Sequence, residues 1–129
     1  MKLSKLAQAL CLTTTLLTAV ATVSATEVEV LHYWTSGGEA KSAAELKKMM
    51  EAKGITWKDF AVAGGGGENA MTALKARVIA GNPPTAAQIK GPAIQEWGDE
   101  GVLANIDAAA IDGKWDANLP VVVSNVMKY

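Results

Sequence analysis

The stretch "EVEVLHYWTSGGEAKSAAELKKMMEAKG", residues 27–54, contains the first full unit of the fold: a strand, a sharp break and a helix. Polar and apolar residues alternate at its start and then give way to bulky ones, which predicts a strand over Glu27–Tyr33 that enters a buried sheet. The segment Ser36–Gly38 ends this strand. From about Ala40 to Lys53 the apolar residues follow helical spacing, and Gly54 provides a left-handed stop.

Two similar units follow along the chain. A half-buried strand is predicted over Ile55–Ala63, followed by four glycines, Gly64–Gly67, and then by a helix in "ENAMTALKARVIAG" that ends at Gly81. A short apolar run, Thr85–Ile89, predicts a third strand, because the Gly91-Pro92 pair breaks the chain directly after it.

The last third of the chain is less regular. Pro92 opens a helix that runs to about Glu100. After "GVLANID" the chain has an alanine patch, Ala108–Ala110, and the tail "LPVVVSNVMKY" is expected to be helical from Pro120 onward despite its β-branched residues.

The alternation of strands and helices predicts an α/β domain with a mostly parallel sheet and helices on both of its faces. In open sheets of this kind ligands bind outside the carboxyl ends of the strands. Three segments are therefore predicted to meet there: Tyr33–Glu39, Gly64–Asn69 and Gln88–Pro92.

The first 25 residues have the features of a secretory signal. Lys2 and Lys5 precede an apolar run that closes on Val23-Ser24-Ala25, which predicts cleavage after Ala25 and export of the remainder as one domain. Cys11 is the one cysteine of the chain and lies inside this leader, so the exported part is expected to carry no thiol, disulfide or lipid.

Charge and composition exclude several functions. The chain has 12 basic and 13 acidic residues, and loss of the leader with its two lysines changes the formal charge from −1 to −3. With Arg77 as the single arginine there is no basic patch for nucleic acid. One histidine, His32, and no cysteine in the exported part leave no Cys-His catalytic pair and no histidine-rich metal site, so no metal and no cofactor are predicted. We expect His32 to pack within its strand.

The glycine run allows more than one interpretation. Free backbone N–H groups at the start of a helix favour an anion. The nucleotide-binding patterns nevertheless fail, because Glu68 and Asn69 stand where those patterns need other residues, and Glu68 would repel a phosphate. A plain tight turn, or a close approach to a neutral ligand or to neighbouring backbone, remains.

The corner after the first strand holds two of the seven aromatic residues of the chain, Tyr33 and Trp34. An aromatic face can stack on the apolar face of a sugar ring while a carboxylate such as Glu39 accepts hydrogen bonds from the hydroxyls. In the alternative interpretation, one aromatic packs in the core and Glu39 only stabilises a helix start.

Gln88 and Lys90 are two residues apart at the end of the third predicted strand, so both side chains are expected on one side of it. Lys90 would donate hydrogen bonds to sugar oxygens, or it is a solvated lysine at a strand end. An enzyme stays among the alternatives, because a glycosidase needs only two carboxylates, for which Glu39 and Glu68 are candidates.

Four segments together resemble the solute-binding proteins of sugar ABC importers, in particular the periplasmic glucose/mannose type. They are "VEVLHYWTSGGE", "AVAGGGGENAMTALKARVIAGNPP", "AQIKGPAIQEW" and "GVLANID". The resemblance covers essentially the whole exported chain, and it implies a monomeric periplasmic protein of two lobes that closes around a monosaccharide and delivers it to membrane permease subunits.

By the same resemblance, Trp34 would stack on the sugar, Glu39 would accept its hydroxyls and Lys90 would donate to them. Tyr33 stands where related sequences often have a second Trp, and Gln88 lies near the site. The family is much longer, so residues 26–129 resemble part of an N-terminal lobe, without the second lobe that would bury the sugar. A secreted carbohydrate-active enzyme and a binding module for another small solute remain as alternatives.

Overall fold

The computed structural model describes residues 26–129, so the predicted leader and Cys11 lie outside the described part of the chain. The elements follow in the order β1 (Glu27–His32), α1 (Gly37–Glu51), β2 (Thr56–Ala61), the 3-10 turn η1 (Gly65–Gly67), α2 (Glu68–Ile79), β3 (Ala86–Ala87), α3 (Gly91–Asp99), α4 (Asp107–Asp112), α5 (Trp115–Asn118) and α6 (Val121–Val126).

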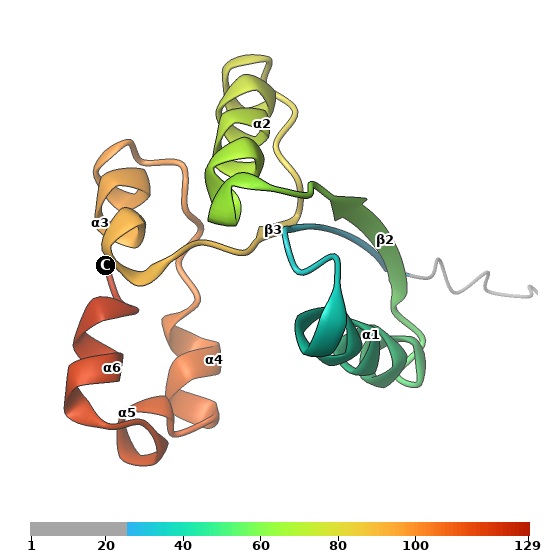
Figure 1. Cartoon of the computed structure of the whole chain (residues 1–129). Coiled ribbons are helices and arrows are strands. Elements are labelled where there is room, and N and C mark those ends of the chain that lie inside the picture. Colours follow the sequence, from blue (N-terminus) through green and yellow to red (C-terminus); the bar gives the residue numbers. More distant parts are fainter. Residues whose placement is uncertain (1–25) are drawn as a thin grey trace, which may run out of the picture.

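The three strands form one parallel sheet with β1 in the middle, in the order β2-β1-β3. Leu31 pairs with Phe60 of β2 on one side and with Ala87 of β3 on the other. Helices α1 and α2 lie on opposite sides of this sheet (Figure 1). The predicted fold class, a parallel α/β arrangement with helices on both faces, is therefore confirmed.

The core lies where α2 covers the central strand. Leu31 is fully buried and clusters with Ala70 and Leu74 of α2, with partly buried side chains such as Tyr33 and Phe60 around them. The helical stripe of α2 and the bulky end of β1 thus meet as their sequence patterns predict.

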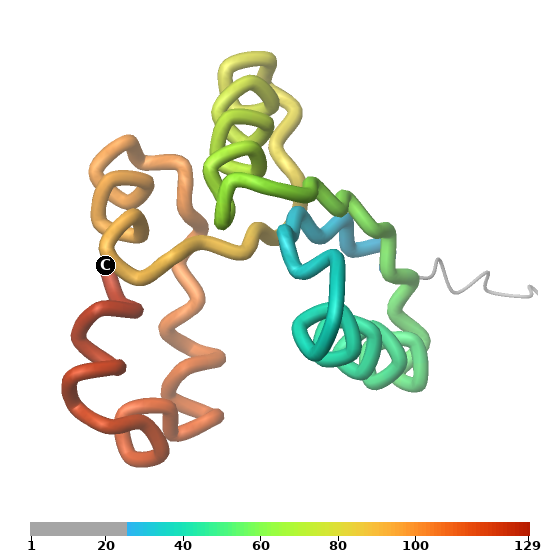
Figure 2. The backbone as a smooth tube through the Cα atoms, viewed as in Figure 1, coloured from blue at the N-terminus to red at the C-terminus, as the bar shows by residue number. Residues whose placement is uncertain are grey.

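The remaining helices lie beyond the sheet. After α2 the chain returns through β3 and then leaves the sheet toward α3, after which α4, α5 and α6 follow (Figure 2). None of the helices in residues 26–129 is both long enough and apolar enough to cross a membrane.

The structure corrects the bounds of one predicted strand and adds two helices. The third strand was expected over Thr85–Ile89 but pairs only at Ala86–Ala87, because the two prolines before it and the glycine-proline pair after it leave few residues for a ladder. Helices α4 and α5 were not predicted. They are too short to show a helical repeat, and Lys114 between them has a left-handed backbone with φ +50°.

Three other predictions are confirmed. Gly54 and Gly81, predicted as left-handed stops, have φ values of +77° and +69°. The tail is helical after Pro120, as α6 shows.

Candidate functional site

A cavity of about 490 Å³ lies at the carboxyl ends of β1 and β3. Its lining contains all five residues that the sequence singled out, together with residues of the glycine run and of the loop after β1: Tyr33, Trp34, Thr35, Ser36, Glu39, Gly64, Gly66, Gly67, Gln88 and Lys90. The volume is within the range of small-molecule sites, about 300–1,000 Å³. The three segments predicted to meet at the sheet's carboxyl end do meet there.

Each wall of the cavity comes from the end of a different element. Strand β1 ends at His32, so Tyr33 and Trp34 lie in the loop that leads into α1. Glu39 lies in the first turn of α1, and Lys90 is the residue that precedes the first turn of α3. Thr35 and Ser36 also line the cavity and were not among the predicted site residues, although they lie between Trp34 and Glu39 in the sequence.

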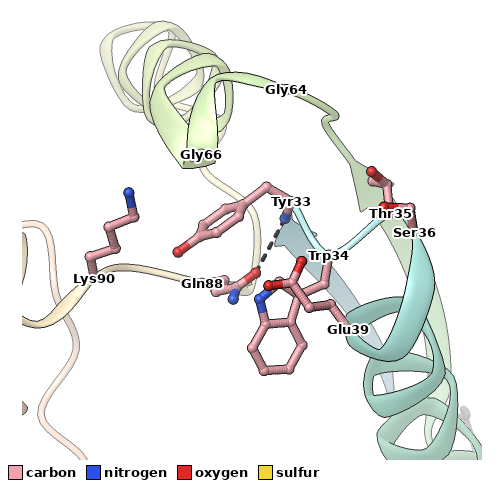
Figure 3. A pocket seen from close by; sticks show the side chains of 10 residues that line it. Tyr33, Trp34, Thr35, Ser36, Glu39, Gly64, Gly66, Gln88 and Lys90 are labelled. Atoms are coloured by element: carbon pink, nitrogen blue, oxygen red, sulfur yellow. Dashed lines mark hydrogen bonds between the residues drawn. The ribbon is translucent and has the colours of Figure 1, made fainter.

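The two aromatic residues have different surroundings. The Tyr33 ring packs against the core cluster, and a Cβ atom placed on Gly67 would lie 3.1 Å from its Cε1 atom. Trp34 is half-buried and takes no part in this cluster. Figure 3 shows the Trp34 ring beside the Glu39 carboxylate, with Tyr33 directed toward the Lys90 side. Of the two rings, Trp34 is therefore the one with the freer surface for a ligand.

The charged groups of the lining are Glu39 and Lys90, and both side chains are exposed. Within residues 26–129, neither has an ion-pair partner. Gln88 is half-buried, and its Oε1 atom accepts a hydrogen bond from the backbone N–H of Tyr33 at 3.2 Å. The cavity thus offers one free carboxylate, one free ammonium group and one amide.

The glycine run forms a tight turn in which all four residues have positive φ values: 90°, 64°, 56° and 107° for Gly64 to Gly67. Any other residue would be strained in this conformation. Asn69 closes the turn by donating from Nδ2 to the carbonyl oxygen of Ala63 at 3.1 Å. The predicted turn is confirmed, and its edge forms part of the cavity wall.

A polar network beneath the cavity connects α1 to the sheet. Asp59 of β2 accepts hydrogen bonds from Lys47 of α1 at 2.7 Å and from the Trp57 indole at 2.6 Å. His32 is buried at the end of β1, as predicted, with its Nε2 atom 3.3 Å from Asp59. The Lys47 ammonium, and after it the hydrogen bonds from Trp57 and His32, hold the pKa of Asp59 below its usual value. Through Lys47 the network links the helix that carries Glu39 to β2.

The network also borders a second, smaller hollow of about 340 Å³ between α1 and the sheet. It shares Trp34 and Thr35 with the main cavity, and several alanines line the rest of it. The Trp34 side chain thus contributes to both hollows.

The arrangement gives no support to an enzymatic site. Glu68, the second carboxylate of the proposed glycosidase pair, lies in the first turn of α2 and is not part of the cavity lining. Glu39 is the one carboxylate among the lining residues, whereas this chemistry needs two that flank the bond. Within the described part of the chain, no group of three or more His, Cys, Asp and Glu side chains could hold a metal ion.

A parallel α/β unit with an open cavity at the carboxyl ends of its strands is consistent with part of one lobe of a solute-binding protein, because open sheets of this kind bind ligands there. Curated proteins with similar sequences are named accordingly. A probable sugar-binding periplasmic protein of Rhizobium meliloti is 52% identical over 114 residues, which is 88% of this chain and 28% of that protein. A protein of the same name from Mesorhizobium japonicum is 45% identical over 103 residues, 80% of this chain and 25% of that protein.

A more distant relative points to the same class. An uncharacterized ABC transporter extracellular-binding protein of Pyrococcus horikoshii is 40% identical over 65 residues, 49% of this chain and 15% of that protein. No family model matches the chain. The relatives confirm the resemblance to periplasmic sugar-binding proteins, and none of these three is named as an enzyme. The chain spans about a quarter of the length of the two relatives from Rhizobium and Mesorhizobium.

Proposed function

We propose that the chain is part of a periplasmic sugar-binding protein and that its cavity takes a monosaccharide of the glucose or mannose type for delivery to an ABC import permease. The observation that carries this proposal is that Trp34, Glu39 and Lys90 line one cavity at the sheet's carboxyl end. An aromatic face, a hydroxyl acceptor and a hydroxyl donor are the three kinds of group that recognise a sugar ring. The names of the similar proteins support the same conclusion.

In this proposal Trp34 stacks on the ring and Glu39 accepts hydrogen bonds from its hydroxyls. Lys90 donates to ring or hydroxyl oxygens from the other side, and Tyr33 and Gln88 complete the wall between them. Glu39 and Lys90 are exposed, so residues 26–129 leave much of a bound sugar in water, whereas tight sites bury most of the ligand. We therefore expect this chain to bind as a monomer and more weakly than at millimolar affinity.

The test is a titration of the ¹⁵N-labelled chain, residues 26–129, followed by NMR through the four tryptophan indole N–H signals. Glucose and mannose, raised well above millimolar concentration, should progressively shift the Trp34 signal and leave Trp115 of α5 unchanged, which makes Trp115 an internal control. Sorbitol is the matched ligand control, because it has the hydroxyls but no ring face to stack. In the same spectra, Trp34→Ala should abolish the response of the backbone amide signals of other lining residues, such as Gln88 and Lys90, and Trp115→Ala should not.

The result also separates the alternatives. If neither sugar shifts Trp34, or if all four indoles respond equally, the proposed site is wrong. A response to a different small solute but to no sugar would support a binding module of another specificity. Turnover of a chromogenic glycoside that Glu39→Gln removes would support an enzyme.

A further inference from the structure

Gln88 has an amide group whose orientation the structure determines. Its partner is the backbone N–H of Tyr33, at 3.2 Å, and a backbone N–H can only donate. The atom that faces Tyr33 must therefore be the amide oxygen, and the NH₂ group lies on the other side of the amide. Figure 3 shows this nitrogen pointing away from the Tyr33 backbone nitrogen. Within residues 26–129 the NH₂ group donates to no protein atom, and the Gln88 side chain lines the cavity.

Tyr33, which fixes this orientation, is itself firmly held. Its ring packs on the cluster of Leu31, Ala70 and Leu74. On another side the ring lies against Gly67, where even a single Cβ atom would come within 3.1 Å of it. The N–H that orients Gln88 therefore belongs to a residue that the core keeps in place, and the amide orientation is built into the fold.

Lys90 continues the same wall. Its ammonium group lies close to the glycine turn, 3.7 Å from where a Cβ atom of Gly66 would stand, and it has no anionic partner within the described residues. The NH₂ group of Gln88 and the ammonium of Lys90 are thus two donors of the lining that have no protein acceptor within residues 26–129. Glu39, an acceptor when ionised, comes from α1, and its carboxylate lies beside the Trp34 ring (Figure 3).

We propose that Gln88 is a specificity-determining residue of the cavity, because Tyr33 engages its oxygen and so leaves its NH₂ group to donate to a ligand. This inference rests on the proposed function. A ligand then needs an acceptor oxygen at Gln88 and a donor hydroxyl at Glu39, which restricts the orientation of the sugar ring. Replacing the amide nitrogen by an oxygen leaves a ligand oxygen facing another acceptor, a mismatch that costs about tenfold or more in affinity.

The decisive variant is Gln88→Glu, which exchanges one atom of the donor group and keeps an oxygen for the Tyr33 N–H. We expect the Tyr33 amide signal of the ligand-free variant to stay near its wild-type position. The initial slope of the Trp34 shift against sugar concentration, which is inversely proportional to the dissociation constant, should fall about tenfold or more. Gln88→Met removes both atoms and should shift the Tyr33 signal as well as weaken binding. Gln95→Glu makes the same change of charge on α3, outside the cavity, and should leave binding unchanged.

The outcomes separate this inference from the proposed function. If the wild-type chain binds no sugar, the proposed function fails and the inference fails with it. If the wild type binds and Gln88→Glu binds equally well, the donor role is wrong while the proposed function stands. If Gln88→Met leaves the Tyr33 amide signal in place, the hydrogen bond that orients the amide is absent and the inference is overturned. A loss of binding in Gln95→Glu equal to that in Gln88→Glu would show a general effect of charge, which also overturns it.

Discussion

Leu31 and Ser124 are the buried centres of two regions that are built differently. Around Leu31, the sheet and α2 enclose an apolar cluster, and the cavity lies at the end of the same strand. In α4, α5 and α6, the one buried residue is Ser124, a polar one, while Ile111, Val121 and Val122 are each more than 70% exposed. Burial of apolar surface is the main source of stability. The comparison therefore predicts a robust region that carries the site and a weakly held helical region.

The largest expected effect is that of Leu31→Ala. The Leu31 side chain is fully buried at the centre of the sheet, and its truncation should lower the free energy of unfolding by about 3 kcal/mol through lost burial and a residual cavity. Urea denaturation followed by circular dichroism measures this.

Val122→Ala is the matched control in the helical region, where the side chain is 77% exposed. Its effect should stay within about 0.5 kcal/mol. Equal effects of the two substitutions would show that the two regions do not differ in the way described.

The next effect concerns the wall between the core and the cavity. Gly67 has a φ of +107° and touches the Tyr33 ring, so Gly67→Ala should cost about 2 kcal/mol or more through backbone strain and displacement of Tyr33. Gly101 has a φ of +68° and open space around it, so Gly101→Ala carries only the backbone cost of about 1 kcal/mol. Urea denaturation gives both values. If Gly101→Ala is as costly as Gly67→Ala, the Tyr33 contact contributes nothing.

A smaller effect tests the helical region. The Ser124 hydroxyl donates to Asp116 Oδ1 at 2.6 Å and joins α6 to α5. Ser124→Ala should cost about 1 kcal/mol and should accelerate amide hydrogen exchange in α5 and α6 while β1 keeps its protection. Ser42→Ala is the control, because that hydroxyl is exposed on α1 and bonds only to Gly38. Faster exchange in β1 as well would mean that the two regions unfold together.

Sequence patterns were enough to predict the elements around Leu31, because β1 and α2 are long enough to show a period. Alternation in β1 and the helical stripe of α2 each predicted an element and its buried face, and the rule for parallel sheets then brought Trp34, Gln88 and Lys90 together. In the second region α4 and α5 have six and four residues, fewer than two helical turns each, which is too short to show a repeat.

The individual side-chain contacts between these distant segments could not be predicted. The oxygen of Gln88 bonds to Tyr33 across 55 positions in the sequence, and the Tyr33 ring fits against Gly67 only because the glycine turn folds back over it. No local pattern contains this information. It is also the part of the site on which the proposed role of Gln88 depends.

The smallest expected effect is the pH dependence of the network that holds α1 on the sheet. The Lys47 ammonium, helped by Trp57 and His32, lowers the pKa of Asp59. In the unfolded chain Asp59 returns to its ordinary pKa of 3.8, so the unfolded state binds the proton more readily. The stabilisation is therefore fully present above that pKa and is lost as the pH falls through the lower, folded pKa.

Because the Asp59 side chain is 46% exposed, solvent screens the pair and its contribution should stay below about 1 kcal/mol. Urea midpoints measured between neutral and acid pH should fall less steeply below pH 4 in Asp59→Asn than in the wild type. Glu45→Gln, which removes a more exposed pair with Lys48 on the same helix, should leave the wild-type slope nearly unchanged. If Asp59→Asn keeps the full slope, the acid sensitivity comes from elsewhere, and the network does not contribute to holding the helix that carries Glu39.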